Sequence, residues 1–136
     1  MSVILTPGQS GDNPQLLPLL DQISVRRDGP GRPRSRPDAV IADKAYSHPS
    51  TRRAMRDRGV RFTSPEKSDQ IQRRKAKGSA GGRPPGFDPG QYRDRNVVER
   101  CFARLKQFRD LATRYAKRAA YYAAELTIAA IVLWLR

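Results

Sequence analysis

Residues 39–63, with the sequence AVIADKAYSHPSTRRAMRDRGVRFT, indicate the fold class of this chain. The apolar run at residues 39–42 is typical of a short buried strand. A helix is predicted over residues 49–58, because Pro49 suits its first turn and Gly59 suits its end. Residues 60–63 have the pattern of a second strand. Because the order strand, helix, strand favours parallel pairing, the sequence predicts a compact βαβ unit in an α/β fold.

A second informative stretch, QYRDRNVVERCFARLKQFR, covers residues 91–109. It contains Tyr92, Arg95, Glu99 and Lys106 in the spacing Tyr-x2-Arg-x3-Glu-x6-Lys. At about 100° per residue, these side chains fall within about 60° of one another on a helix that begins by Tyr92. One carboxylate flanked by two cations and a phenol suits a site that handles phosphates and a metal.

Apolar residues of the same stretch predict that this helix packs into a core. They form a second, broad face, made of Val97, Val98, Cys101, Phe102, Leu105 and Phe108. The alternative is an amphipathic surface helix whose charged face is solvated. Spacing alone favours that alternative, because Arg, Glu and Lys are common on exposed helix faces.

Composition limits the possible classes of protein. A chain of 136 residues, 38% of them hydrophobic, predicts one domain or part of one, with a modest core. The net charge of +14 points to a polyanionic partner, most often nucleic acid. Because Cys101 is the single cysteine, no disulfide framework is possible within one chain, and the N-terminal sequence does not resemble a signal peptide. We therefore expect a cytoplasmic protein.

The flanking segments give coarser predictions. Residues 2–6 have the pattern of a strand, and Asp12 is a candidate cap for a following helix with Pro14 in its first turn. Residues 26–37 form a basic loop rich in Pro and Gly. Residues 64–91 are expected to be a mobile basic loop, which either closes over DNA or is a disordered insertion.

The C-terminal sequence AAYYAAELTIAAIVLWLR is apolar on nearly every side. A membrane span is one interpretation, but the run is marginal in length and is interrupted by Glu125 and Thr127. A helix buried in the core is the interpretation that we favour, with no membrane contact. In a fragment, the apolar surface of such a helix would be left partly exposed.

Asp43 follows the first predicted strand of the βαβ unit. Parallel sheets tend to place ligands beyond the carboxyl ends of their strands. An aspartate after a strand can equally be a turn former or a helix cap. Together with Glu99 on a core helix, Asp43 becomes a candidate metal ligand, since two-metal phosphoryl transfer requires several converging carboxylates.

These residues resemble the C-terminal part of insertion-sequence transposases with a DDE triad. The match at Tyr92, Arg95, Glu99 and Lys106 is complete, and VIADKAYS is similar to the family's second Asp segment. Further similar segments are VILTPGQSGDNPQL, GVRFTSPEK, GGRPPGFD and LATRYAK. The similar segments are spread over nearly the whole chain. We therefore assign residues 1–136 to the C-terminal portion of a DDE catalytic domain.

The resemblance implies both chemistry and partners. It makes Asp43 and Glu99 catalytic acids that bind Mg²⁺ or Mn²⁺, and it makes Tyr92, Arg95 and Lys106 DNA-binding residues. The reaction would be DNA strand cleavage and transfer by two-metal phosphoryl transfer. The implied fold is RNase H-like, a mixed sheet flanked by helices. Implied partners are double-stranded DNA at the element ends and either a second copy or an upstream transposase half.

One departure from the family concerns the first acid of the triad. In the family it lies before the segment that matches SVILTPGQ, whereas Asp12 and Asp21 come after that segment. We therefore expect an incomplete fold that lacks the first strand or strands, weak metal binding and no cleavage by the chain alone. The alternatives are one half of a split or frameshifted transposase, and a non-catalytic basic DNA-binding module. A basic RNA-binding protein is a more distant possibility.

Overall fold

The computed structural model describes residues 2–135. The chain divides into two compact units, which are described separately. One, the sheet unit, consists of Gln9–Asp94 together with Ser2. The other, the helical unit, comprises Val3–Gly8 and the chain from Arg95 onward. The sequence prediction of one domain, or part of one, did not anticipate this division.

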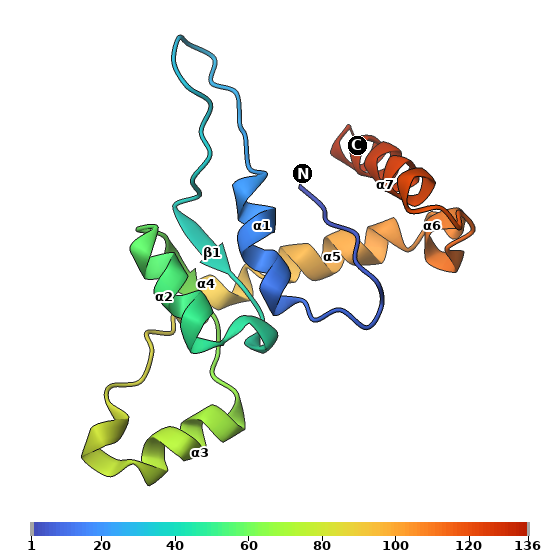
Figure 1. Cartoon of the computed structure of the whole chain (residues 1–136). Helices are drawn as coiled ribbons and strands as arrows, with labels where there is room; N and C mark the ends of the chain where they lie inside the picture. The colour runs from blue at the N-terminus through green and yellow to red at the C-terminus, as the bar shows by residue number, and fades with distance from the viewer. Residues whose placement is uncertain (1, 136) are drawn as a thin grey trace. The chain divides into compact units, whose positions relative to one another are not determined.

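The sheet unit contains all the regular strands assigned within residues 2–135 (Figure 1). Its elements in chain order are η1 (Asn13–Gln15), α1 (Leu16–Asp21), β1 (Ala39–Ile41), η2 (Lys44–Tyr46), α2 (Pro49–Asp57), β2 (Arg61–Thr63), α3 (Ser68–Ala76), η3 (Gly78–Gly81) and α4 (Pro89–Arg93). The helical unit contains α5 (Asn96–Leu105), α6 (Arg109–Thr113) and α7 (Ala119–Trp134). The described chain is thus mixed α/β, with a small sheet.

The predicted βαβ unit is confirmed. Strands β1 and β2 pair in parallel, with Val40 opposite Phe62. Helix α2 connects them and begins with Pro49 in its first turn. It ends in a Schellman motif, in which Val60 N–H donates to the Met55 carbonyl and Gly59 N–H to that of Arg56, both over 2.9 Å. Pro49 at the start of α2 and Gly59 at its end fix the bounds of this helix, and both signals are local in the sequence.

A small hydrophobic core holds the sheet unit together. Its buried members come from α1, α2 and the residue just before β2, namely Leu16, Leu20, Met55 and Val60. Met55 has no exposed surface, so it is the centre of this core. Thr51 of α2 also donates from its hydroxyl to Oδ1 of Asn13 over 2.9 Å, which ties α2 to η1.

Two predictions for the N-terminal region are corrected. Residues 2–6 carry no strand assignment, and the sheet described within residues 2–135 contains only β1 and β2. A strand needs hydrogen-bonding neighbours, which an apolar sequence pattern does not supply. Asp12 does precede η1, but its side chain makes no capping hydrogen bond. Instead, its backbone carbonyl accepts from Gln15 N–H over 3.0 Å.

Residues 64–91 contain helix α3 and η3, so the prediction of a loop throughout was wrong. The overall composition of the segment hides a nine-residue run, Ser68–Ala76, that lacks Gly and Pro. Asp69 lies in its first turn and three cations lie in its last turn, which complements the helix dipole. The mobility of this segment stays a prediction.

Helix α7 is far more exposed than a core helix. Within it only Ala129 is buried, while Ile128, Ile131 and Trp134 are 62%, 53% and 89% exposed. Ala129 packs with Leu105 and Leu111 in the small core of the helical unit. The interpretation of a fully buried helix is therefore wrong, whereas the alternative of a partly exposed apolar surface agrees with the structure. No helix within residues 2–135 is long and apolar enough to cross a membrane.

Candidate active site

Asp43 lies directly beyond the carboxyl end of β1, as predicted. Ala42 N–H donates to the Thr63 carbonyl over 2.9 Å, so bonding to β2 continues as far as Ala42, the residue before Asp43. The Asp43 carboxylate accepts a hydrogen bond from Ala45 N–H and caps η2. The capping role considered from the sequence is therefore real, and it orients the carboxylate at the sheet edge.

The backbone of Asp43 is fixed as well. Its carbonyl accepts from the hydroxyl of Ser64 over 2.8 Å and from Tyr46 N–H over 3.1 Å. Ser64 follows β2 and is 1% exposed. One of these bonds is local, and the other joins Asp43 to a buried residue that follows β2. Together they hold the segment that carries Asp43 at the end of the sheet.

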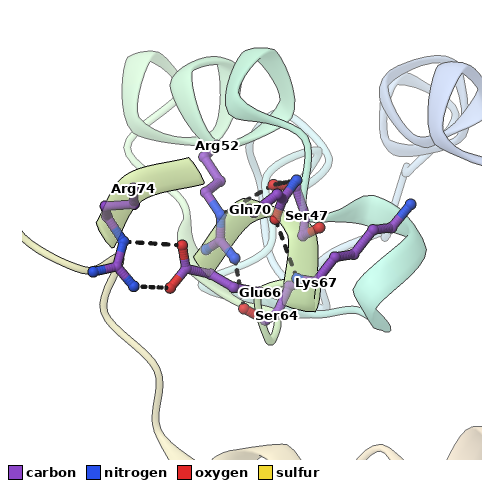
Figure 2. A network of polar contacts seen from close by, with 7 residues as sticks. All are labelled: Ser47, Arg52, Ser64, Glu66, Lys67, Gln70 and Arg74. Carbon is purple, nitrogen blue, oxygen red and sulfur yellow. Dashed lines mark hydrogen bonds and ion pairs between the residues drawn. The ribbon is translucent and has the colours of Figure 1, made fainter. Parts of the chain in front are cut away.

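A polar network extends from Ser64 to α2 and α3 (Figure 2). Arg52 donates from Nη2 to the Ser64 carbonyl over 2.7 Å and from Nε to the Ser47 carbonyl over 3.3 Å. Burial lowers the pKa of the Arg52 guanidinium, while the charge of Glu66 opposes that shift. Arg52 therefore joins the two chain segments that follow β1 and β2.

Helix α3 is attached to the same network. Arg74 donates to both carboxylate oxygens of Glu66, over 2.7 and 3.4 Å, and the two side chains are only 21% and 17% exposed (Figure 2). Gln70 donates to the Ser47 carbonyl over 3.4 Å. Sequence analysis missed this network, because no local pattern reveals an arginine that bonds carbonyls from distant segments.

Tyr92 belongs to α4, which is bonded to the same edge of the sheet. Thr63 donates from its hydroxyl to Oε1 of Gln91, the neighbour of Tyr92, over 2.6 Å. Asp88 caps α4 by accepting from Gln91 N–H over 3.0 Å. The ring of Tyr92 lies 5.3 Å from that of Phe87, centre to centre. The structure thus brings Asp43 and the helix that carries Tyr92 to one sheet edge.

The predicted single helix with four aligned side chains is corrected. Helix α5 begins at Asn96, so Tyr92 lies on the preceding helix, α4. Between them, Asp94 N–H donates to the Gln91 carbonyl and Val98 N–H to the Arg95 carbonyl, over 3.1 and 2.9 Å. These bonds span three residues instead of four, which tightens the chain and interrupts the α-helical ladder.

Arg95, Glu99 and Lys106 all lie on or beside α5. Arg95 precedes its first residue, Glu99 is in its first turn and Lys106 follows its last residue. Arg95 and Glu99 form an ion pair, in which Glu99 remains 57% exposed. Lys106 is exposed. The acid of the predicted site is therefore already neutralised locally by the arginine beside it.

The apolar face of α5 is only partly buried. Leu105 is buried, whereas Val97, Val98 and Phe102 are 57%, 47% and 59% exposed. The expectation that this whole face packs into a core was wrong. In the core of the helical unit, Leu105 and the partly buried Cys101 of α5 pack with residues of α6 and α7, and this contact covers only part of the apolar face.

A divalent metal ion would need several oxygen donors close together. Carboxylate oxygens such as those of Asp43 and Glu99 are suitable for Mg²⁺ or Mn²⁺. Among the residues that the structure describes, however, no three His, Cys, Asp or Glu side chains gather as a metal-binding group. Asp43 is in the sheet unit and Glu99 in the helical unit, so their pairing on a metal stays a prediction.

Comparison with known proteins identifies the family. Residues 1–135 match the family described as the transposase DDE domain, and the chain belongs to this family. Over 135 residues the chain is 36% identical to a Burkholderia cepacia protein described as "Putative transposase for insertion sequence element IS402". That alignment covers 98% of this chain and 56% of the relative, so the chain spans little more than half the relative's length. No solved structure matches.

Family membership confirms the resemblance found in the sequence. It also implies an RNase H-like fold. The mixed α/β architecture with a parallel strand pair agrees with that class.

Proposed function

We propose that this chain supplies part of the active site of a DNA transposase. Asp43 and Glu99 are two of its catalytic acids, and Tyr92, Arg95 and Lys106 contact DNA phosphates. The observation that carries the proposal is the position of Asp43, held at the carboxyl end of β1 beside the bonded end of β2. Ligand sites of α/β proteins lie at this edge.

The donor chemistry supports a divalent cation at the acids. A bound Mg²⁺ or Mn²⁺ would supply Lewis-acid stabilisation of the phosphoryl oxygens. For its part, the chain orients the Asp43 carboxylate through the Ala45 N–H, and it holds Glu99 through Arg95. When DNA binds, Arg95 would have to leave Glu99 and pair with a DNA phosphate instead. The Glu99 carboxylate would then be free to bind the metal ion.

We also propose that the 136-residue chain does not cleave DNA by itself. The resemblance assigns it two acids of a triad, and two carboxylates are few for a site that binds two metal ions. The partner that completes the site would be an upstream transposase segment or a second copy of the chain. The partner DNA would be the double-stranded ends of the element.

A chimaera tests the roles of the two acids. This chain replaces the matching segment of the Burkholderia cepacia relative, and excision of a marked element is measured in cells. Asp43→Asn and Glu99→Gln should each abolish excision, while Asp57→Asn, an exposed aspartate at the end of α2, should leave it intact. Excision that survives Asp43→Asn or Glu99→Gln removes that residue from the proposed site.

The isolated chain tests the remaining alternative. Its net charge of +14 favours a non-catalytic DNA-binding module. That module would bind duplex DNA equally well with and without Asp43→Asn, and the chimaera would show no excision at all. Mg²⁺-dependent nicking by the isolated chain, lost in Asp43→Asn, would instead show that the chain is active without a partner.

A further inference from the structure

Residues 25–36 form an arginine-rich hairpin in the sheet unit, which we call the arginine hairpin. Its sequence is VRRDGPGRPRSR. Val25 and Arg34 exchange backbone hydrogen bonds of 2.9 and 2.8 Å in an isolated antiparallel bridge. Beyond that bridge the chain extends as a long excursion between α1 and β1, drawn in light blue in Figure 1. The hairpin therefore has a defined base and an exposed tip.

The arginine hairpin borders a pocket of about 290 Å³ that is open to solvent. The pocket is lined by Arg27, Arg32, Pro33, Arg34, Ser35, Arg36 and Asp38. The lining contains four arginines and one aspartate, so it carries an excess of positive charge. A pocket with this lining selects an anion.

Two of the arginines are held in place by bonds to the hairpin and to residues beside it. Arg34 pairs with Asp38 and donates from Nε to the Arg36 carbonyl over 3.3 Å. Arg36 donates from Nη1 to the Arg58 carbonyl over 3.4 Å, which anchors the hairpin base to the end of α2. Hydrogen bonding by Arg34, and its charge, hold the pKa of Asp38 below its ordinary value. These arginines therefore shape the pocket, and one of them pairs with its carboxylate.

Arg27 and Arg32 have no such internal role. Neither takes part in a hydrogen bond or ion pair within residues 2–135, and both side chains are exposed. Their guanidinium groups therefore keep their donors for a ligand. A guanidinium binds phosphate oxygens in a two-pronged manner that a simple ammonium cannot reproduce.

We propose that the arginine hairpin is a DNA-backbone site, in which Arg27 and Arg32 bind phosphodiester groups of duplex DNA. This inference rests on the proposed function, because family membership makes duplex DNA the polyanion that the chain meets. The pocket offers no aromatic side chain for base stacking, so its contacts are to phosphate and are independent of base sequence. The hairpin adds affinity outside the positions assigned to catalysis.

Fluorescence anisotropy with a labelled DNA duplex tests the site across a range of salt concentrations. The variant Arg27→Gln/Arg32→Gln is compared with Arg53→Gln/Arg56→Gln, which removes the same charge from exposed positions on α2 of the same unit. Loss of two phosphate contacts should lower the slope of log affinity against log salt by about 1.8, and affinity at 0.1 M salt by on the order of tenfold to a hundredfold. The control should change both far less.

Other outcomes separate the two proposals. If the parent chain does not bind duplex DNA, the proposed function fails together with the hairpin site. If the parent binds but the hairpin variant matches its control, only the hairpin site fails. Binding that depends on Arg27 and Arg32 but is tighter for duplex RNA than for DNA overturns the assignment to DNA.

Two further arms complete the test. Arg27→Lys/Arg32→Lys keeps the charge, so it should restore the salt slope while recovering only part of the affinity.

Inorganic phosphate, compared with chloride at equal ionic strength, should not displace the duplex. Selective displacement by phosphate would assign the pocket to a free anion and overturn the proposal. Thermal melts show whether each variant folds. If Arg27→Gln/Arg32→Gln does not fold, the affinity of Arg27→Lys/Arg32→Lys relative to the parent is the test.

Discussion

Arg52 donates to the backbone carbonyl of Ser64 over 2.7 Å. Ser64, in turn, donates from its hydroxyl to the carbonyl of Asp43 over 2.8 Å. A side chain of α2 therefore positions the proposed catalytic aspartate through one intermediate residue. Because Ser64 is 1% exposed, its carbonyl has little access to water if Arg52 is removed.

Replacing Arg52 should destabilise the sheet unit. Arg52→Met leaves the Ser64 carbonyl without this partner and should lower the free energy of unfolding by about 1–3 kcal/mol. Urea denaturation followed by circular dichroism measures the change. Arg53→Met, at the exposed neighbouring position, should stay within about 0.5 kcal/mol of the parent. Equal effects of the two substitutions would show that the Arg52 contacts add no stability.

The Glu66–Arg74 pair should show measurable coupling. A double-mutant cycle with Glu66→Gln and Arg74→Gln should give about 0.5–2 kcal/mol, because the pair is bidentate and mostly buried. The exposed Asp69–Arg73 pair of the same helix is the matched control and should give about 0.3–0.5 kcal/mol. A Glu66–Arg74 coupling no larger than the control would mean that this pair contributes no more than an exposed ion pair to holding α3 in place.

Gly59 should not tolerate a side chain. Its φ of 63° closes the Schellman motif of α2, and this region is unfavourable for residues with a Cβ. Gly59→Ala should therefore lower the melting temperature, with a destabilisation of about 1 kcal/mol. Gly29→Ala is the control, since a Cβ there would meet nothing within 4 Å. A stability unchanged in Gly59→Ala would contradict the motif.

Tyr46 should couple stability to alkaline pH. Burial, and then the charges of Asp12 and Asp43, raise the pKa of its phenol above the ordinary value. A raised folded-state pKa means that the neutral form is favoured in the native chain. Its contribution is therefore present below the unfolded pKa of about 10 and is lost as pH rises through the folded pKa.

Unfolding of the parent chain and of Tyr46→Phe at neutral and alkaline pH measures this contribution. The parent should lose more stability than Tyr46→Phe as the pH rises beyond about 10. Tyr115→Phe, at a position that is 77% exposed, is the control and should follow the parent. Identical pH profiles for the parent and Tyr46→Phe would contradict the predicted coupling.

Trp134 is the single tryptophan of the chain and is 89% exposed. The emission spectrum of the folded chain at low concentration should therefore resemble that of the unfolded chain, and iodide should quench it readily. A shift to shorter wavelength as concentration rises would show that another molecule covers the end of α7. Such a shift already present at the lowest concentration would contradict the exposed position.

The βαβ unit could be predicted because its signals are local. Pro49 starts α2, Gly59 ends it, and the apolar runs on either side have strand character. Asp43 could be placed at the sheet edge for the same reason, since its position follows from where β1 stops. Helix α3 was missed because the composition of residues 64–91, taken as a whole, conceals the short run Ser68–Ala76.

The sequence alone determined the α/β class, the family and the identities of the candidate residues, because spacing and local start and stop signals carry that information. Only the tertiary structure decided that Tyr92 and Glu99 lie on separate helices, and that Arg52 supports the Asp43 segment through Ser64. It also decided which apolar side chains of α5 and α7 are covered. Burial and long-range hydrogen bonds depend on which distant segments meet, and no local pattern in the sequence encodes that.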